Sequence, residues 1–235
     1  MLKCSHILCK VTNLPEVVRH YESLGFSMEW GSAPEKACNA LLWFEEGPFI
    51  EFFQIPKVFE YVGVPLGLVY GQAARRRWFH WAAAPEGWCD VAMEPAEEAE
   101  ENTARAFGQL RAAVVEAGIS TSRVIKGKRT RRDGSKVRYR FFAPDPVGLP
   151  FVVSAYDPPQ RPERVVHPNG ATCVAYVNVG VSEKHRSAFE TLSKGDTRIK
   201  IKPSPQTRVV EVGLSGLSSP LDHTQLHGAV FEAAE

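Results

Sequence analysis

A repeated order of short strands and one helix constrains the fold of this chain more than any other feature. Residues 3–55 read as a β-rich strand, a helix and three short strands, and the same order returns over residues 77–156. Asn13 and Pro15 suit the start of the first helix, and Gly25 suits its end. A repeat of this length is too long for a solenoid and indicates module duplication. We therefore predict an α+β fold in which tandem βαβββ modules form a half-open, curved mixed sheet.

The second module is predicted to open with a strand over Arg77–Ala84 and to continue with a helix over Glu97–Ala117, whose acidic first turn suits the helix dipole. Asp133-Gly134 is a strong turn signal for the hairpin that follows. A third, shortened copy is expected after a proline-rich link. The predicted divisions are a first module (1–56), a linker loop (57–76), a second module (77–156), the link with a truncated third module (157–214) and a C-terminal tail (215–235) with a weak helical signal.

The composition argues against several classes of partner. Of the 235 residues, 44% are hydrophobic and 23% are charged, and the formal charge of +1 gives no global field that would attract nucleic acid or an anionic membrane. The N-terminus has no signal-peptide pattern, and no apolar run is long enough to span a membrane. Five cysteines without a C-x-x-C pair suit a reducing compartment. We therefore expect a cytoplasmic protein that acts on a small molecule.

Aligning the two complete modules by their predicted strands brings metal-binding residue types together. His6 and His80 fall at matching places on the two first strands, and Glu51 and Ser154 on the two fourth strands. Two neutral imidazoles and one carboxylate suit Fe(II), Mn(II), Ni(II), Co(II) or Zn(II) better than Mg(II) or Ca(II). Serine is a poor ligand, so the predicted set is His6, Glu51 and His80 with open positions, as in catalytic metal sites.

Several short segments within residues 3–182 together carry a family resemblance. They are His6-Ile7-Leu8 with the helix Val17–Phe26, Cys38-Asn39-Ala40-Leu41, Phe49-Ile50-Glu51-Phe52-Phe53, Leu149-Pro150-Phe151 and His167-Pro168-Asn169-Gly170-Ala171. With these segments the chain resembles the vicinal oxygen chelate superfamily, and more specifically its glyoxalase-like domain proteins. This superfamily includes glyoxalase I, bleomycin-resistance proteins, fosfomycin-resistance enzymes and extradiol dioxygenases.

The resemblance implies metal ligands on the first and fourth strands of paired modules, which carries over onto His6, Glu51 and His80. Ser154 departs from the pattern, because many members place a carboxylate there. The leading hypothesis is a metal-dependent enzyme of the dioxygenase, isomerase or lyase type that acts on a small molecule with adjacent oxygen atoms. The alternative is a metal-free protein that binds a drug or natural product, as the antibiotic-binding members do.

The same residues also have simpler interpretations. His6 and His80 could be half-buried strand residues. Side chains alternate between the two faces of a strand, which would also allow Glu51 to point at solvent. His167 is either a turn residue or a substrate contact that reaches over the curved sheet. The predicted hairpin over Arg123–Arg140 is rich in Lys and Arg, and it is either a solvated surface or a source of substrate contacts, with Arg138 and Arg140 as candidates. The third half-module could complete the sheet of a second copy in a homodimer.

Overall fold

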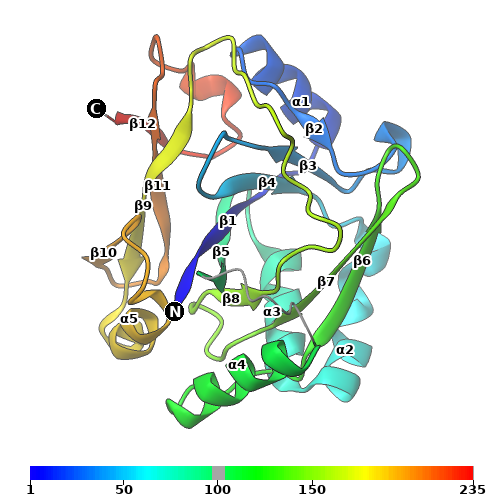
Figure 1. Ribbon diagram of the computed structural model, residues 1–235, viewed down its shortest axis with the longest axis vertical. Coiled ribbons are helices and arrows are strands. Elements are labelled where there is room, and N and C mark those ends of the chain that lie inside the picture. Colours follow the sequence, from blue (N-terminus) through cyan, green and yellow to red (C-terminus); the bar gives the residue numbers. More distant parts are fainter. Residues whose placement is uncertain (97–103, 235) are drawn as a thin grey trace.

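The structure is a computed structural model that describes residues 1–96 and 104–234, and it confirms the predicted fold class. Within these residues an eight-stranded, strongly curled mixed sheet lies beside a four-stranded sheet (Figure 1). The larger sheet has the order β2-β3-β4-β1-β5-β8-β7-β6. Its strands are β1 (Leu2–Lys10), β2 (Glu29–Trp30), β3 (Asn39–Leu42), β4 (Phe49–Phe53), β5 (Gly87–Pro95), β6 (Ile125–Thr130), β7 (Lys136–Phe142) and β8 (Phe151–Val153).

Two βαβββ modules meet at the centre of this sheet. In the first module β1 runs parallel to β4, and in the second module β5 runs parallel to β8. Strands β1 and β5 pair antiparallel and join the modules. Helices α1 (Leu14–Ser23) and α4 (Ala104–Glu116) pack on one face and share a core with both sheets. The first seven residues of the predicted helix Glu97–Ala117, with its acidic opening, lie outside the described residues.

Helix α1 forms where the sequence predicted it. The Asn13 side chain accepts a hydrogen bond from the Glu16 backbone N–H, and a proline stands in the first turn. After the helix, Gly25 has a φ of 81°, which a residue without Cβ adopts at little cost. The buried face of α1 covers the first module from the side opposite to the cavity described below.

The predicted strand over Arg77–Ala84 is wrong, because these residues belong to a helix. The helix is α3 (Gln72–Ala83). The segment predicted as a linker loop before it is also helical and forms η2 (Lys57–Val62) and α2 (Gly63–Tyr70). Helix α3 is rich in alanine and arginine, which are strong helix formers. The buried ion pair between Arg77 and Asp90 fastens it to β5, which is the first strand of the second module.

The smaller sheet forms in the region that was predicted as the third, truncated copy. Strand β9 (Cys173–Val181) is followed by η3 (Glu183–His185), α5 (Arg186–Ser193), β10 (Ile199–Pro203) and β11 (Arg208–Ser215). Strand β11 contacts β5, so the two sheets share one core. The short helix η1 (Pro34–Lys36) completes the first module.

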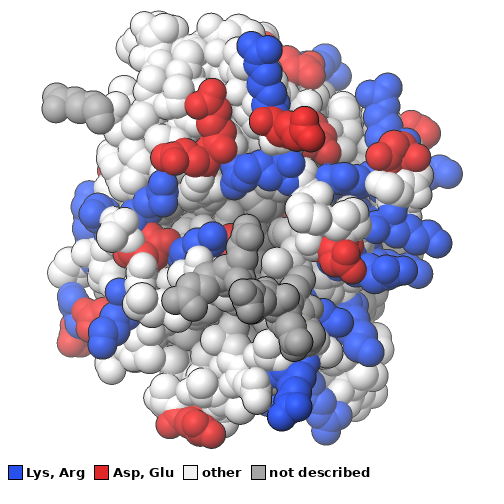
Figure 2. All heavy atoms as spheres, viewed as in Figure 1, with Lys and Arg blue, Asp and Glu red and all other residues white. Residues whose placement is uncertain are grey.

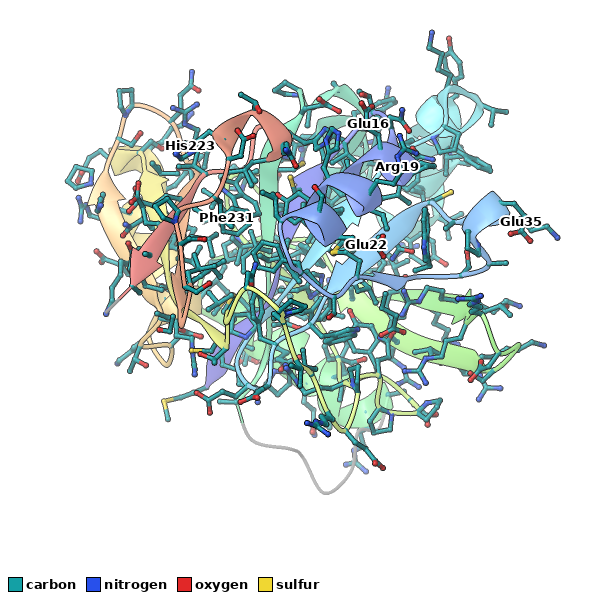
Figure 3. All side chains as sticks on the ribbon, turned by 90° about the horizontal axis from the view of Figure 1, so that it is seen from above. Glu16, Arg19, Glu22, Glu35, His223 and Phe231 are labelled. Atoms are coloured by element: carbon teal, nitrogen blue, oxygen red, sulfur yellow. The ribbon has the colours of Figure 1, made fainter. Side chains whose placement is uncertain are left out.

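The predicted weak helix in the C-terminal tail is wrong. Within residues 215–234 only the short η4 (His223–Gln225) is helical, and β12 (Phe231–Ala234) pairs in parallel with β11 as the edge of the smaller sheet. Figure 3 shows this segment, with His223 labelled, beside α1. The tail is therefore a structural cover for the first module. Every helix in residues 1–96 and 104–234 is too short or too polar to cross a bilayer.

Candidate functional site

The concave face of the large sheet contains a cavity of about 390 Å³. A change of register between Cys4 and His6 in the pairing of β1 with β5 marks a bulge, after which His6 and Leu8 face the cavity. Ile7 and Cys9 alternate to the opposite face and belong to the main core. The bulge and the period of the strand therefore direct the His6 ring into the cavity.

Glu51 reaches the same cavity from β4. Its neighbours Ile50 and Phe52 are fully buried in the main core, so the alternation of the strand turns Glu51 to the concave side. There it lines the cavity together with Phe49 and Phe53. Glu51 therefore points into this cavity, where its side chain is 22% exposed, rather than into bulk solvent.

His6 and Glu51 lie side by side in the wall of this cavity. His6 Nε2 is 3.6 Å from Glu51 Oε2, which is longer than a hydrogen bond. The His6 side chain is only 3% exposed, and burial lowers its pKa to about 3, so the ring is neutral. It stacks on Phe49 with ring centroids 4.6 Å apart, and its Nδ1 lies 3.2 Å from Ser5 Oγ.

Two neighbours of Glu51 partly offset the effect of burial on the pKa of its carboxyl group. Burial raises the pKa of this carboxyl, while a hydrogen bond from Asn39 Nδ2 to Oε1 at 2.7 Å and the nearby charge of Arg129 lower it. Sequence reasoning missed both partners. Asn39 could have been found from register, because it lies opposite Phe53 and therefore on the same face as Glu51.

The structure does not bring His80 to the other two predicted ligands. His80 is exposed on α3, and its Nε2 lies 3.1 Å from the Cys89 carbonyl oxygen. It borders a different, small cavity of about 30 Å³, on which neither His6 nor Glu51 lies. The alignment that paired His80 with His6 assumed a strand where the chain forms a helix.

Strand register shows which residue of the second module corresponds to His6. His6 pairs with Phe49 between β1 and β4, and Ala92 pairs with Phe151 between β5 and β8. Ala92 therefore occupies the position for which a second histidine was predicted, and its methyl group cannot bind a metal.

The prediction that Ser154 corresponds to Glu51 on the fourth strand is also wrong. Phe49 on β4 corresponds to Phe151 on β8. Glu51 lies two residues after Phe49, and Val153 lies two residues after Phe151. Val153, and not Ser154, therefore corresponds to Glu51. Ser154 is buried, where its Oγ accepts a hydrogen bond from the Arg140 backbone N–H and donates one to the Ala155 carbonyl. Val153 lines the cavity instead.

His6 and Glu51 match two ligand positions of a divalent ion, but the described residues offer no third. Metal–nitrogen and metal–oxygen bonds of about 2.0–2.2 Å place two ligand atoms roughly 3–4 Å apart, and the observed 3.6 Å falls in this range. Residues 1–96 and 104–234 contain no group of three His, Cys, Asp or Glu side chains that could hold an ion. The predicted three-ligand set is therefore not assembled in the described part of the chain.

The remaining candidate residues lie in two different environments. Arg138 and Arg140 line a second cavity next to the first. His167 is buried elsewhere, where its Nε2 lies 2.8 Å from the Trp43 carbonyl oxygen and its Nδ1 accepts a hydrogen bond from the Ser27 N–H at 3.0 Å. Because both ring nitrogens have protein partners, the geometry supports the turn interpretation of His167.

The walls of the cavity that holds His6 and Glu51 are largely aromatic. Trp81 on α3 lines the cavity and contacts Phe141 and Phe151, with ring centroids 6.2 and 5.4 Å away. Tyr139 and Tyr156 also line this cavity, with their ring centroids 5.4 Å apart. A mainly apolar cavity with a few convergent polar groups is the usual form of a small-molecule site.

The family model for the glyoxalase-like domain matches residues 4–194. The chain belongs to this family. Its fold is that of the vicinal oxygen chelate superfamily, as the sequence resemblance implied. No curated protein matches the chain.

Solved structures resemble this chain over most of its length at low sequence identity. A hypothetical protein from Staphylococcus aureus has 12% identity and a TM-score of 0.63, with 100% of both chains covered. The Mn(II)-bound glyoxalase from Novosphingobium aromaticivorans has 12% identity and a TM-score of 0.53, covering 95% of this chain and 68% of that one. An extradiol ring-cleaving dioxygenase from B. fuscum has 13% identity and a TM-score of 0.48, covering 92% and 57%. At these identities the likeness to the first two structures shows the fold alone.

Proposed function

We propose that this chain binds a small molecule with an apolar ring and adjacent oxygen atoms in the concave cavity. The observation that carries this proposal is the position of His6 Nε2 and Glu51 Oε2, which are 3.6 Å apart in an aromatic cavity and do not hydrogen-bond to each other. His6 Nδ1 and Glu51 Oε1 already have partners in Ser5 and Asn39, which leaves His6 Nε2 and Glu51 Oε2 to contact a ligand. A ligand hydroxyl can donate to the carboxylate and accept from the imidazole, which satisfies both groups at once.

A neutral imidazole beside a carboxylate also gives this site the means to move a proton. In its neutral form His6 has one donor and one acceptor nitrogen, and Glu51 accepts hydrogen bonds when ionised. A ligand hydroxyl between them would be oriented by both groups, and Glu51 could remove its proton. The aromatic walls would exclude water from this end of the ligand.

The binding proposal is tested with 2,3-dihydroxynaphthalene as a probe, by isothermal titration calorimetry in buffer with chelator. We expect binding by the unmodified chain and a loss of roughly tenfold or more in affinity in Glu51→Gln, because a hydrogen bond to a charged group contributes about 1.5–3 kcal/mol. His80→Ala is the matched control and should bind like the unmodified chain. No binding by the unmodified chain would reject the proposal.

The second candidate is metal-dependent chemistry of the dioxygenase, isomerase or lyase type. The observation that favours it is the spacing of His6 Nε2 and Glu51 Oε2, which suits two ligands of one divalent ion. His6 and Glu51 would hold Fe(II), Mn(II), Ni(II), Co(II) or Zn(II), and the ion when bound would act as a Lewis acid on the adjacent oxygens of the small molecule. With two described protein ligands, this candidate stands behind metal-free binding.

Metal analysis separates the two candidates. Near-stoichiometric metal in protein purified anaerobically without chelator, lost in Glu51→Ala, together with probe binding that disappears when chelator is added, would favour the metal-dependent function. Protein that stays metal-free after reconstitution, and binds the probe equally with and without chelator, would favour metal-free binding.

A further inference from the structure

A second cavity of about 750 Å³ adjoins the aromatic cavity on the concave side. The two cavities share wall residues, among them Phe49, Tyr139, Tyr156 and Gln160. One ligand could therefore occupy both cavities, with its ring near His6 and Glu51 and another group beyond Tyr139 and Tyr156.

The second cavity is strongly basic. Six Lys or Arg residues line it, against the two acidic residues Glu94 and Asp157. Lys3 already faces Glu94 at 3.7 Å, and the Arg161 guanidinium is occupied by the backbone carbonyls of Phe44 and Gly47. The other four basic residues lie on β6 and β7. They are Lys126, Lys128, Arg138 and Arg140.

The pairing of β6 with β7 places these four cations directly opposite one another. Lys126 pairs with Arg140, and Lys128 pairs with Arg138. Like charges at opposite positions of a sheet destabilise it. Among the described residues, no acidic side chain forms an ion pair with any of the four, although other ion pairs occur across the molecule. Figure 2 shows Lys and Arg side chains gathered on the side that carries β6 and β7 in Figure 1.

Arg140 gives a second reason to expect a bound ligand in this cavity. Its Nε is buried and has no hydrogen-bond acceptor among the described residues. A buried donor without a partner is uncommon and costs free energy, more so for a charged group. An anionic group in the cavity would supply the missing acceptor and relieve the repulsion between the paired cations.

We infer that this second cavity is an anion site, and that the ligand combines an apolar ring with a phosphate or carboxylate group. This inference rests on the proposed function, because the ring is assigned to the aromatic cavity. Arg138 and Arg140 would bind the anion by charge-assisted hydrogen bonds, and Lys126 and Lys128 would add positive charge from the neighbouring strand. The four cations thus select the anionic member of a series of ring compounds.

The test compares 1-naphthyl phosphate, 1-naphthoate and 1-naphthol by titration calorimetry at low salt. We expect at least one of the two anions to bind about tenfold or more tightly than 1-naphthol, and whichever binds better identifies the anionic group. Arg138→Gln and Arg140→Gln, each checked for an unchanged melting temperature, should lose this preference while keeping the affinity for 1-naphthol. Lys136→Gln lies on the same strand, exposed and outside both cavities, and should keep the preference.

Three outcomes would overturn the inference. If 1-naphthol binds as well as both anions, the anion site is wrong while the proposed function stands. If Lys136→Gln loses the preference as much as Arg140→Gln does, the effect is general surface charge. If none of the three compounds binds to the folded protein, the proposed function fails together with the inference.

Discussion

Arg77 on α3 and Asp90 on β5 form a buried ion pair with 2.7 Å between Nη1 and Oδ2. Arg77 also donates from Nη2 to the carbonyl oxygens of Pro144 and Leu149, while Asp90 accepts a further hydrogen bond from Trp81 Nε1. The pair therefore joins α3 to the first strand of the second module and to the loop before β8. It holds the aromatic face of α3 over the cavity.

Removing one partner of this pair should strongly destabilise the protein. We expect Arg77→Ala to lower the free energy of unfolding by about 3–5 kcal/mol, because the Asp90 charge would stay buried without its partner. Urea unfolding followed by tryptophan fluorescence measures this loss. Arg76→Ala is the control. It breaks an exposed pair with Asp145 and should cost less than about 1 kcal/mol. Equal losses in the two variants would contradict the structural role of Arg77.

Local sequence patterns predicted most strands, because a strand is marked by the alternation of side chains within a short segment. The alternation in β1 and β4 follows directly from one buried and one concave face, and Asn13 with Pro15 marks the start of α1. Helix α3 was missed because the run Trp78–Trp81 resembles an aromatic strand. The contact that orients this helix, between Arg77 and Asp90, leaves no periodic signal in the sequence.

Two of the three residues predicted as ligands, His6 and Glu51, lie together in the structure, and His80 does not. His6 and Glu51 meet as expected, because both lie on strands whose alternation is clear in the sequence. His80 followed the wrong assignment of α3. Val153, rather than Ser154, faces the cavity because the short strand β8 is offset by one residue from the sequence alignment, and one residue reverses the face of a strand.

His167 should make stability depend on pH. Its Nδ1 accepts from the Ser27 N–H, so the bound form is neutral, and burial lowers its pKa below 6.5. The unfolded chain binds a proton as pH falls through 6.5, whereas the folded chain does so only at lower pH. Stability from this residue is therefore fully present above pH 6.5 and is lost as pH falls through the lowered pKa, by at most about 1.4 kcal/mol per pH unit.

The contribution of His167 can be isolated by substitution. Glutamine can donate and accept hydrogen bonds but does not titrate, so His167→Gln should lose less stability between pH 7.5 and pH 4.5 than the unmodified chain. Urea unfolding at four pH values measures both curves. His223→Gln, at an exposed position, is the control. Parallel curves for the unmodified chain and His167→Gln would show that His167 does not cause the acid sensitivity.

Gly31→Ala should weaken ligand binding without touching the ligand. A Cβ at this position would lie 1.8 Å from Asn39 Oδ1 and 2.7 Å from Arg129 Nη1, so both side chains would have to move. Asn39 would then lose its hydrogen bond to Glu51. We expect roughly tenfold weaker binding of 2,3-dihydroxynaphthalene, measured by calorimetry, as for other lost hydrogen bonds to a charged group.

Gly108→Ala is the matched control for this substitution. Gly108 lies within α4, and a Cβ there would meet no atom within 4 Å. Alanine should therefore raise the free energy of unfolding by about 0.5–1 kcal/mol and leave the affinity unchanged. If Gly31→Ala binds the probe like Gly108→Ala, the Asn39 contact does not orient Glu51 for binding.

Phe231→Ala should show that the C-terminal tail stabilises the first module. The Phe231 ring packs against Tyr21 and Phe26, with centroids 6.3 and 6.4 Å away, and against Trp88 at 5.2 Å. Figure 3 shows Phe231 on the segment that lies beside α1. Truncating a buried phenylalanine leaves a cavity, so we expect a loss of about 3–5 kcal/mol in the free energy of unfolding, measured by urea denaturation.

The neighbouring residue supplies the control for the tail. Val230 is 41% exposed, so Val230→Ala should change stability by less than about 0.5 kcal/mol. Its backbone contacts are unaffected, because the Val212 N–H and Trp88 Nε1 donate to the Val230 carbonyl rather than to its side chain. A large loss in Phe231→Ala beside an unchanged Val230→Ala would assign the stabilisation to the buried ring. Equally small changes in both variants would show that the tail contributes little, even though β12 pairs with β11.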